Sequence, residues 1–212
     1  MNPSQSLQDA CSVPDSLLAH SDEDLIRLVY KQFPQEIDRL RRAYSIRDGP
    51  WTPPSTPSPS YILYNEEYDE VNRTLVGLLA LRWIHTGQYE TFVGLQPSAS
   101  QLTRTSFDWI RGFYTQLIKD ANALFTLITS IIINDIGKDP QLATDCHAKT
   151  GVDFSTLNHD AILLVACKAG LVPSLDQLPG QYRDDVLRAI ELGATFNFGQ
   201  LAQAENAPAS LA

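Results

Sequence analysis

Apolar residues recur at steps of three and four along one continuous stretch of the chain, between residues 106 and 134. The repeating positions are Ile110, Phe113, Leu117, Ala121, Leu124, Ile128 and Ile131. This is the period of one face of an α-helix, so the stretch predicts a single long, mostly buried helix that ends at Asp135. Its uncharged part, Ala121 to Asn134, is shorter than the roughly 18 to 20 apolar residues that cross a bilayer. We therefore expect a core helix and no transmembrane segment.

The rest of the chain gives further helical patterns, and no run alternates convincingly at period two. Ser21 can cap an acidic first turn that leads into an apolar stripe, which predicts a helix from Ser21 to Tyr44 with Pro34 as a candidate interruption. Other helices are predicted over residues 64–84, 158–169, 180–192 and 196–205. We expect an all-α, single-domain helical bundle, which could be related to the HD-domain helical folds.

Two segments are expected to lie outside the packed helices. Residues 1–20 precede the first of the strong helical patterns and are expected to form a flexible N-terminus, which leaves residues 21–212 as the domain. The run GPWTPPSTPSPS, which follows Asp48, has no periodicity and many prolines, which lack a backbone N–H donor. It predicts an exposed, extended loop over residues 48–60.

The charge balance and the cysteines restrict the partners and the compartment. The formal net charge of −9 argues against electrostatic binding to nucleic acid or to anionic membranes, which select Lys and Arg. The three cysteines form no CxxC pair, so neither a disulfide framework nor a zinc site is indicated. The first 20 residues lack the features of a secretion signal. We expect reduced thiols in a cytoplasmic protein; the oligomeric state is left open.

The segment from Ile131 to Pro140 is the most informative for chemistry. It delivers the Asp135 carboxylate from the end of an apolar helix, and Gly137 allows a turn that brings Lys138 close to it. Mg²⁺ prefers carboxylate oxygens, and phosphate oxygens bind both that cation and a lysine. This predicts a diphosphate site with Lys138 on the leaving group; the alternative is a solvated lysine that compensates the helix C-terminus.

The same segment resembles the His-Asp-Ile-Gly-Lys signature of the HD-domain metal phosphohydrolases, an all-α superfamily whose adjacent His and Asp bind metal. Asn134 occupies the position of the histidine, and an amide is a weak ligand for a transition metal. That difference counts against an active dinuclear hydrolytic centre. The resemblance also requires a histidine from an upstream helix, and His85 is the best-placed candidate for this ligand.

A second group, Asn158-His159-Asp160, stands at the start of a predicted helix. His159 and Asp160 could join Asp135 and Asp139 as metal ligands, with His159 also in a catalytic role. The alternative is plain helix capping, in which Asn158 or Asp160 bonds the first free amides of the helix. Aromatic residues such as Trp109 and Phe113 could line an apolar cavity or could belong to an ordinary core.

Three blocks of the C-terminal part are similar to a known family: Ile133 to Asp153, Leu157 to Leu175 and Ile190 to Leu211. They resemble fungal sesquiterpene cyclases of abscisic acid biosynthesis, of the α-ionylideneethane synthase type, which work without the usual aspartate-rich motif. The resemblance implies a carbon–oxygen lyase that uses Mg²⁺ to convert farnesyl diphosphate, an isoprenoid diphosphate, into a cyclic sesquiterpene of secondary metabolism. Chains of that family continue further than Ala212.

Three hypotheses therefore remain open for the activity. The first is the sesquiterpene cyclase, in which metal-assisted loss of diphosphate leaves an allylic cation that the pocket folds and quenches. The second is an HD-like metal-dependent phosphohydrolase, against which Asn134 counts. The third is a shortened, catalytically silent family member that keeps the fold. The products formed from farnesyl diphosphate would separate the first two.

Overall fold

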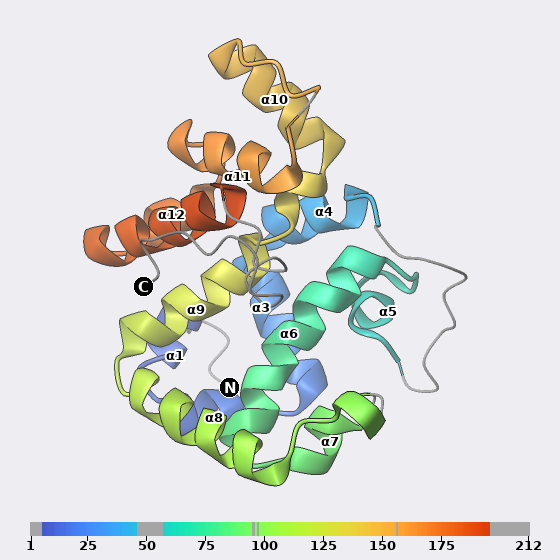
Figure 1. Ribbon diagram of the computed structural model, residues 1–212, viewed down its shortest axis with the longest axis vertical. Helices are drawn as coiled ribbons and strands as arrows, with labels where there is room; N and C mark the ends of the chain where they lie inside the picture. Colours follow the sequence, from blue (N-terminus) through green and yellow to red (C-terminus); the bar gives the residue numbers. More distant parts are fainter. Residues whose placement is uncertain (1–5, 46–56, 95, 97, 156, 196–212) are drawn as a thin grey trace.

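The computed structural model describes residues 6–45, 57–94, 96, 98–155 and 157–195, and these residues form helices and connections without any β-strand. In chain order the α-helices are α1 (Leu7–Ala10), α2 (Pro14–Leu18), α3 (Asp22–Gln32), α4 (Pro34–Arg42), α5 (Pro59–Tyr64), α6 (Asp69–His85), α7 (Tyr89–Val93), α8 (Arg104–Leu117), α9 (Ala121–Ile133), α10 (Pro140–Thr150), α11 (His159–Lys168) and α12 (Gly180–Thr195). Short 3₁₀ turns are η1 (Ser98–Ser100), η2 (Ile136–Lys138) and η3 (Pro173–Gln177). The predicted all-α single-domain bundle is confirmed (Figure 1).

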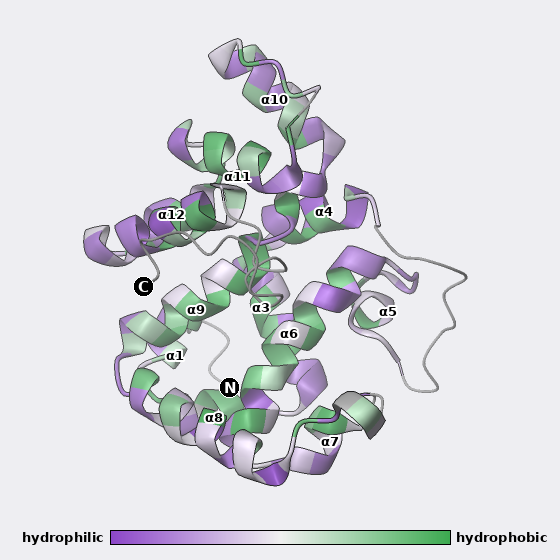
Figure 2. Ribbon diagram, in the orientation of Figure 1, coloured by the Kyte–Doolittle hydropathy of each residue, from purple (hydrophilic) through white to green (hydrophobic). Residues whose placement is uncertain are grey.

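The core forms where α6 and α9 meet their neighbours. Helix α6 packs against α3, α4, α5, α7, α8 and α9, and α9 also packs against α1, α4 and α12. Leu75 and Leu78 of α6 and Leu124, Phe125 and Ile128 of α9 are fully enclosed. Figure 2 shows the contrast between the largely apolar α9 and the outer end of α12, where hydrophilic residues prevail. Burial of these apolar side chains is the main force that holds the helices together.

Helices α10, α11 and α12 gather on one side of the bundle, at the top of the view in Figure 1, whereas α7 and α8 lie at the opposite end. Helix α11 packs against α10, α12 and η2, and η2 also contacts α4 and α9. The short segment between α9 and α10 therefore lies where the group formed by α10, α11 and α12 joins the rest of the bundle. This segment contains Asp135 and Lys138.

The single helix that we predicted over residues 106–134 is wrong, because the chain bends sharply between α8 and α9. The two helical segments meet at 119°. Asp120 has an extended backbone, and its carboxylate accepts the N–H groups of Asn122 and Ala123 as the N-cap of α9. A side-chain cap of this kind replaces the intrahelical partners that the first amides of a new helix lack. The tyrosine hydroxyl of Tyr182 in α12 also donates to the Asp120 carboxylate.

The N-terminal half also differs in part from the predictions. Pro34 does interrupt the first predicted helix and stands at the first position of α4. The helix predicted over 64–84 is divided by Asn65, whose left-handed backbone (φ 56°) ends α5 before α6 begins. Residues 7–18, expected to be flexible, form α1 and α2 and bury Leu7, Leu17 and Leu18.

Two of the predicted segments fall partly or wholly outside the described residues. The proline-rich loop predicted over 48–60 is described only from residue 57 onward, and there Pro59 and Ser60 are buried at the start of α5. The helix predicted over 196–205 lies outside the described residues. Within the part of the chain that the structure describes, no single helix is long and apolar enough to cross a membrane; only α8 taken together with residues 121–138 meets that criterion.

Candidate functional site

The Asn134–Asp139 segment forms a compact connection between two helices. Helix α9 ends with Ile133 buried and with Asn134 exposed at its C-cap, and the chain then makes the 3₁₀ turn η2. Ile136 anchors this turn because its side chain is almost completely buried. Asp139 caps the next helix, where it accepts the N–H of Gln141 and precedes Pro140. Local sequence thus explains both ends of the connection.

Gly137 permits the closest approach in this region, since η2 lies directly against the N-terminus of α11. A Cβ atom at position 137 would lie 2.0 Å from the carbonyl oxygen of His159 and 3.3 Å from Cβ of Leu163. Real Cβ atoms do not approach a backbone oxygen so closely, and the obstructing atom is not at the end of a flexible side chain. Glycine is therefore required by the packing of the two backbones, which also brings His159 close to Asp135.

Lys138 is enclosed within the protein and lies between two carboxylates. Its ammonium nitrogen is 3.0 Å from Oε2 of Glu70 and 2.8 Å from Oδ1 of Asp135. The side chains are 2% exposed for Lys138, 0% for Glu70 and 15% for Asp135. The alternative of a solvated lysine at a helix end is wrong. A diphosphate could reach this ammonium group only by displacing a carboxylate that already neutralises it.

Asp139, a predicted metal ligand, is fully buried and paired with two guanidinium groups. Its Oδ2 lies 3.0 Å from Arg39 and 2.9 Å from Arg42, both on α4. The hydrogen bond to Asp139 is the main cause that raises the pKa of Arg42 above its ordinary value. Arg39 also reaches Asp145 on α10 at 3.1 Å. Asp139 therefore joins α4 to α10 and does not face the other predicted ligands.

The structure does bring Asp135, His159 and Asp160 together. Nε2 of His159 lies 3.8 Å from Oδ1 of Asp135 and 3.4 Å from Oδ1 of Asp160, and the imidazole is 24% exposed. Asn158 caps α11 by accepting the N–H of Ala161 at 2.8 Å, so the capping alternative is confirmed for this residue. His159 and Asp160 thus stand on the first turn of a capped helix, with their polar atoms close to Asp135.

His85, the other predicted ligand, lies far from this group. It ends α6, whereas Glu70 stands near the start of the same helix, 15 residues earlier. At a rise of about 1.5 Å per residue the two positions are about 22 Å apart. Nε2 of His85 instead lies 2.9 Å from Oδ1 of Asp15, and the ring packs edge-on against Tyr114. The histidine belongs to the contact between α6 and the N-terminal helices.

Most of the predicted Mg²⁺ ligands already have other partners in the structure. Among the described residues no group of three or more His, Cys, Asp or Glu side chains is arranged to hold a metal ion. Asp135 already shares its oxygen with the buried ammonium of Lys138, and Asp139 is held by arginines. Mg²⁺ demands near-octahedral oxygen ligation, commonly from one or two free carboxylates and water. Of the predicted ligands close to this region, His159 and Asp160 are partly exposed, with side chains that are 24% and 34% exposed.

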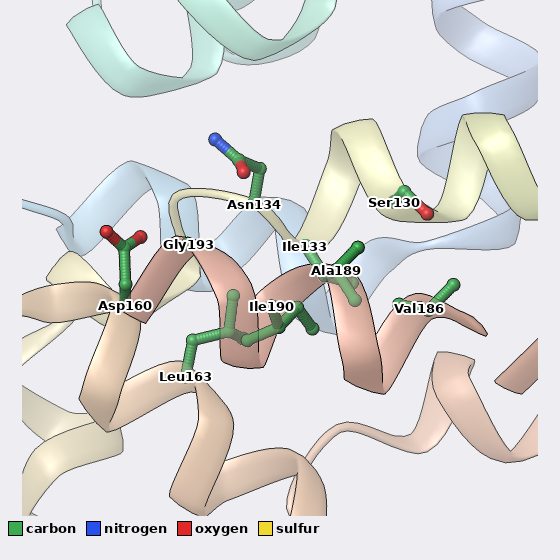
Figure 3. A pocket seen from close by; sticks show the side chains of 9 residues that line it. All are labelled: Ser130, Ile133, Asn134, Asp160, Leu163, Val186, Ala189, Ile190 and Gly193. Carbon is green, nitrogen blue, oxygen red and sulfur yellow. The ribbon is translucent and has the colours of Figure 1, made fainter. Parts of the chain in front are cut away.

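A cavity of about 130 Å³ opens beside this group, between α9, α11 and α12. Its lining residues are Ser130, Ile133, Asn134, Asp160, Leu163, Val186, Ala189, Ile190 and Gly193 (Figure 3). Sequence reasoning missed the contribution of α12, although positions 186, 189, 190 and 193 follow the spacing of one helical stripe. Trp109 and Phe113, proposed as lining residues, are instead stacked on each other and exposed on α8.

Comparison with known proteins gives one match. No curated protein and no solved structure is significantly similar to this chain. A family model with the description "Family of unknown function (DUF6829)" matches residues 26–212, which includes every residue of the group around Lys138 and of the cavity. The chain therefore belongs to the DUF6829 family.

Proposed function

We propose that this protein is catalytically silent with respect to metal-dependent chemistry and that the Asn134–Asp139 segment is a structural junction. The observation that carries this proposal is the position of Lys138, which is buried between Asp135 and Glu70. An ammonium group here occupies the place between carboxylates that a divalent cation would take in a metal enzyme. The lysine satisfies these carboxylates permanently, and the junction then serves to hold α6, α9 and α11 together.

The charges around the junction support this proposal. A metal ion would have to displace a lysine whose side chain is only 2% exposed, and this would leave a buried ammonium group without its carboxylate partners. The cavity beside the junction has no Lys or Arg among its lining residues, and Asp160 adds a negative charge at its polar end. A diphosphate would therefore meet repulsion there, because no cation compensates it.

The size of the cavity supports the same proposal. Sites for small molecules usually measure about 300 to 1,000 Å³. A cavity of about 130 Å³ is well below that range, and a farnesyl chain has 15 carbon atoms in its main chain and branches. Within the described residues, the cavity lined by Asp160 is thus too small for such a substrate without rearrangement of α12.

A sesquiterpene cyclase is the second candidate, and two observations favour it. The blocks from Ile133 to Leu211 resemble the fungal cyclases described above. In addition, Asp135 and His159 come together with Asp160, which lines a cavity that also has apolar residues in its walls. In this candidate farnesyl diphosphate is the substrate, and Asp135 and Asp160 are the residues that would approach Mg²⁺.

Product analysis separates the candidates. The purified protein is incubated with farnesyl diphosphate and Mg²⁺, extracts are analysed by gas chromatography, and released phosphate is measured. We expect neither a hydrocarbon nor phosphate above the level without protein. A cyclic hydrocarbon that disappears in Asp135→Asn would establish the cyclase instead, and phosphate together with farnesol would indicate a hydrolase.

The structural role has its own readout, which is independent of any substrate. Asp135→Asn removes one of the two carboxylates that neutralise Lys138, so it should lower the melting temperature of the protein in the absence of metal. Asp184→Asn, on the exposed surface of α12, makes the same chemical change as a control and should leave the melting temperature nearly unchanged. Equal melting temperatures for the two variants would contradict the structural role.

A further inference from the structure

The cavity between α9, α11 and α12 has the dimensions and walls of a site for a very small molecule. Ile133, Leu163 and Val186 are buried residues that form its apolar part, and Ile190 is half-buried next to them. An apolar protein cavity of about 150 Å³ can hold benzene, which has six heavy atoms. A volume of about 130 Å³ therefore accommodates a body of about five carbon atoms with one small polar group.

One end of this cavity is polar and negative. Asn134 and Asp160 extend to the same side of the view in Figure 3, away from the apolar side chains of Leu163 and Ile190. Asn134 caps the C-terminus of α9, where the free carbonyl groups carry the partial negative charge of the helix dipole. Among the described residues, no Lys or Arg belongs to the lining. The polar end is thus complementary to a cation.

Asp160 is the carboxylate that remains available at this end. The neighbouring Asp135 is neutralised by the buried ammonium of Lys138 at 2.8 Å. Asp160 has His159 at 3.4 Å, and its own side chain is 34% exposed. Asp160 lines the cavity, whereas Asp135 does not, and its side chain is the more exposed of the two. A primary ammonium group can donate up to three hydrogen bonds, which suits a carboxylate, an amide oxygen and backbone carbonyls together.

We propose that this cavity binds a small primary amine, with a branched apolar body of about five carbon atoms between α9, α11 and α12 and its ammonium group on Asp160. Asn134 and the carbonyl end of α9 complete the polar part of the site. This binding requires no metal ion, so it is independent of the outcome of the turnover assay above.

Three probes of nearly identical shape test the proposal: 3-methylbutylamine, 3-methylbutan-1-ol and 3-methylbutanoate, which are cationic, neutral and anionic at pH 7. Binding is measured by titration calorimetry and by chemical-shift changes in the protein. We expect the amine to bind about tenfold or more tightly than the alcohol, as hydrogen bonds to a charged group are stronger. The carboxylate should bind most weakly. Equal affinities, or preference for the carboxylate, would overturn the proposal.

Two variants locate the site. Asp160→Asn keeps the shape of the side chain and should remove the preference for the amine over the alcohol, whereas the control Asp184→Asn should keep it. Ala189→Leu places a larger side chain, which favours helix, at the lining of the cavity and should abolish binding of both probes. Shift changes that appear elsewhere in the protein, or amine binding that survives in Ala189→Leu, would refute the assignment to this cavity.

Discussion

The substitution Lys138→Met tests the buried ion pair most directly, because it keeps an unbranched side chain of similar shape, one heavy atom shorter, and removes the ammonium group. In the folded protein it leaves Glu70, fully buried, and Asp135, mostly buried, without their shared ammonium group. Loss of one partner of a buried pair costs about 3 to 5 kcal/mol. Glu70 keeps a second partner, Arg73 at 3.0 Å, and that arginine is 56% exposed. We therefore expect the lower end of the range, about 3 kcal/mol.

This loss is large enough to measure without ambiguity. For a chain of this length, 1 kcal/mol corresponds to a shift of about 2 to 4 °C in melting temperature, so the expected decrease is about 6 to 12 °C. Urea unfolding at pH 7, followed by circular dichroism, gives the free energy of unfolding independently. The double variant Lys138→Met with Glu70→Gln should recover part of the loss, since it removes one of the carboxylates left unpaired.

Lys168 provides a matched control for this experiment. Its ammonium group lies 3.0 Å from Glu191, the same distance as between Lys138 and Glu70, but both side chains are 55% exposed. An exposed ion pair contributes only about 0 to 1 kcal/mol, so Lys168→Met should change the stability little. If Lys138→Met and Lys168→Met lower the free energy of unfolding equally, burial does not strengthen the first pair and our reasoning fails.

Three further predictions concern packing, acid stability and the core. Gly137→Ala should destabilise the protein by about 3 kcal/mol or more, since its Cβ would lie 2.0 Å from the backbone oxygen of His159. Gly112→Ala is the control: it has open space around it and should stabilise α8 by about 0.5 to 1 kcal/mol. Thermal unfolding of the two variants and the parent measures both effects. The hydrogen bond from the Gln141 amide, followed by the Arg39 guanidinium, holds the pKa of Asp145 below its ordinary value. The stabilisation is therefore present above the unfolded pKa of about 3.9 and is lost as the pH falls through the folded pKa. In urea unfolding, Asp145→Asn should thus be less stable than the parent at pH 7, and the difference should shrink as the pH falls below about 3.9. Ile128→Asp places a charge at a fully buried position and should cost several kcal/mol; unchanged unfolding would contradict the core position of α9.

Local signals in the sequence were sufficient to predict most of the helices. Ser21 accepts the N–H of Asp24 as an N-cap, and Pro34 begins α4, as their residue types indicated. The bend between α8 and α9 was missed because the apolar period continues across it. Leu117 and Ala121 are four residues apart although they belong to different helices. The available signal was Asp120, a favoured N-cap residue directly before the uncharged part of the stretch.

Proximity within the candidate site was predictable only for residues that lie close to the junction in sequence or at the start of the next helix. Asp135, His159 and Asp160 do come together, because Gly137 lets η2 pack on the N-terminus of α11. His85 could not be placed from its sequence context, since its distance from the junction depends on the direction in which α6 runs. The cavity could not be predicted from the sequence either, because its walls come from three helices whose packing the sequence patterns do not specify.

The role of Lys138 depends on a partner that lies 68 residues away in the sequence, and this explains why the motif was ambiguous. A carboxylate and a lysine at the end of an apolar helix suit a phosphate site and a buried ion pair equally well, because both need the same charges at the same spacing. The burial of Glu70 favours the ion pair. In the sequence this glutamate gives no sign of its partner, because acidic residues in the first turn of a helix are common and are explained by the helix dipole alone. A fully buried glutamate requires a cation, however, and the ammonium group of Lys138 lies 3.0 Å from it, which supports the buried ion pair over the phosphate site.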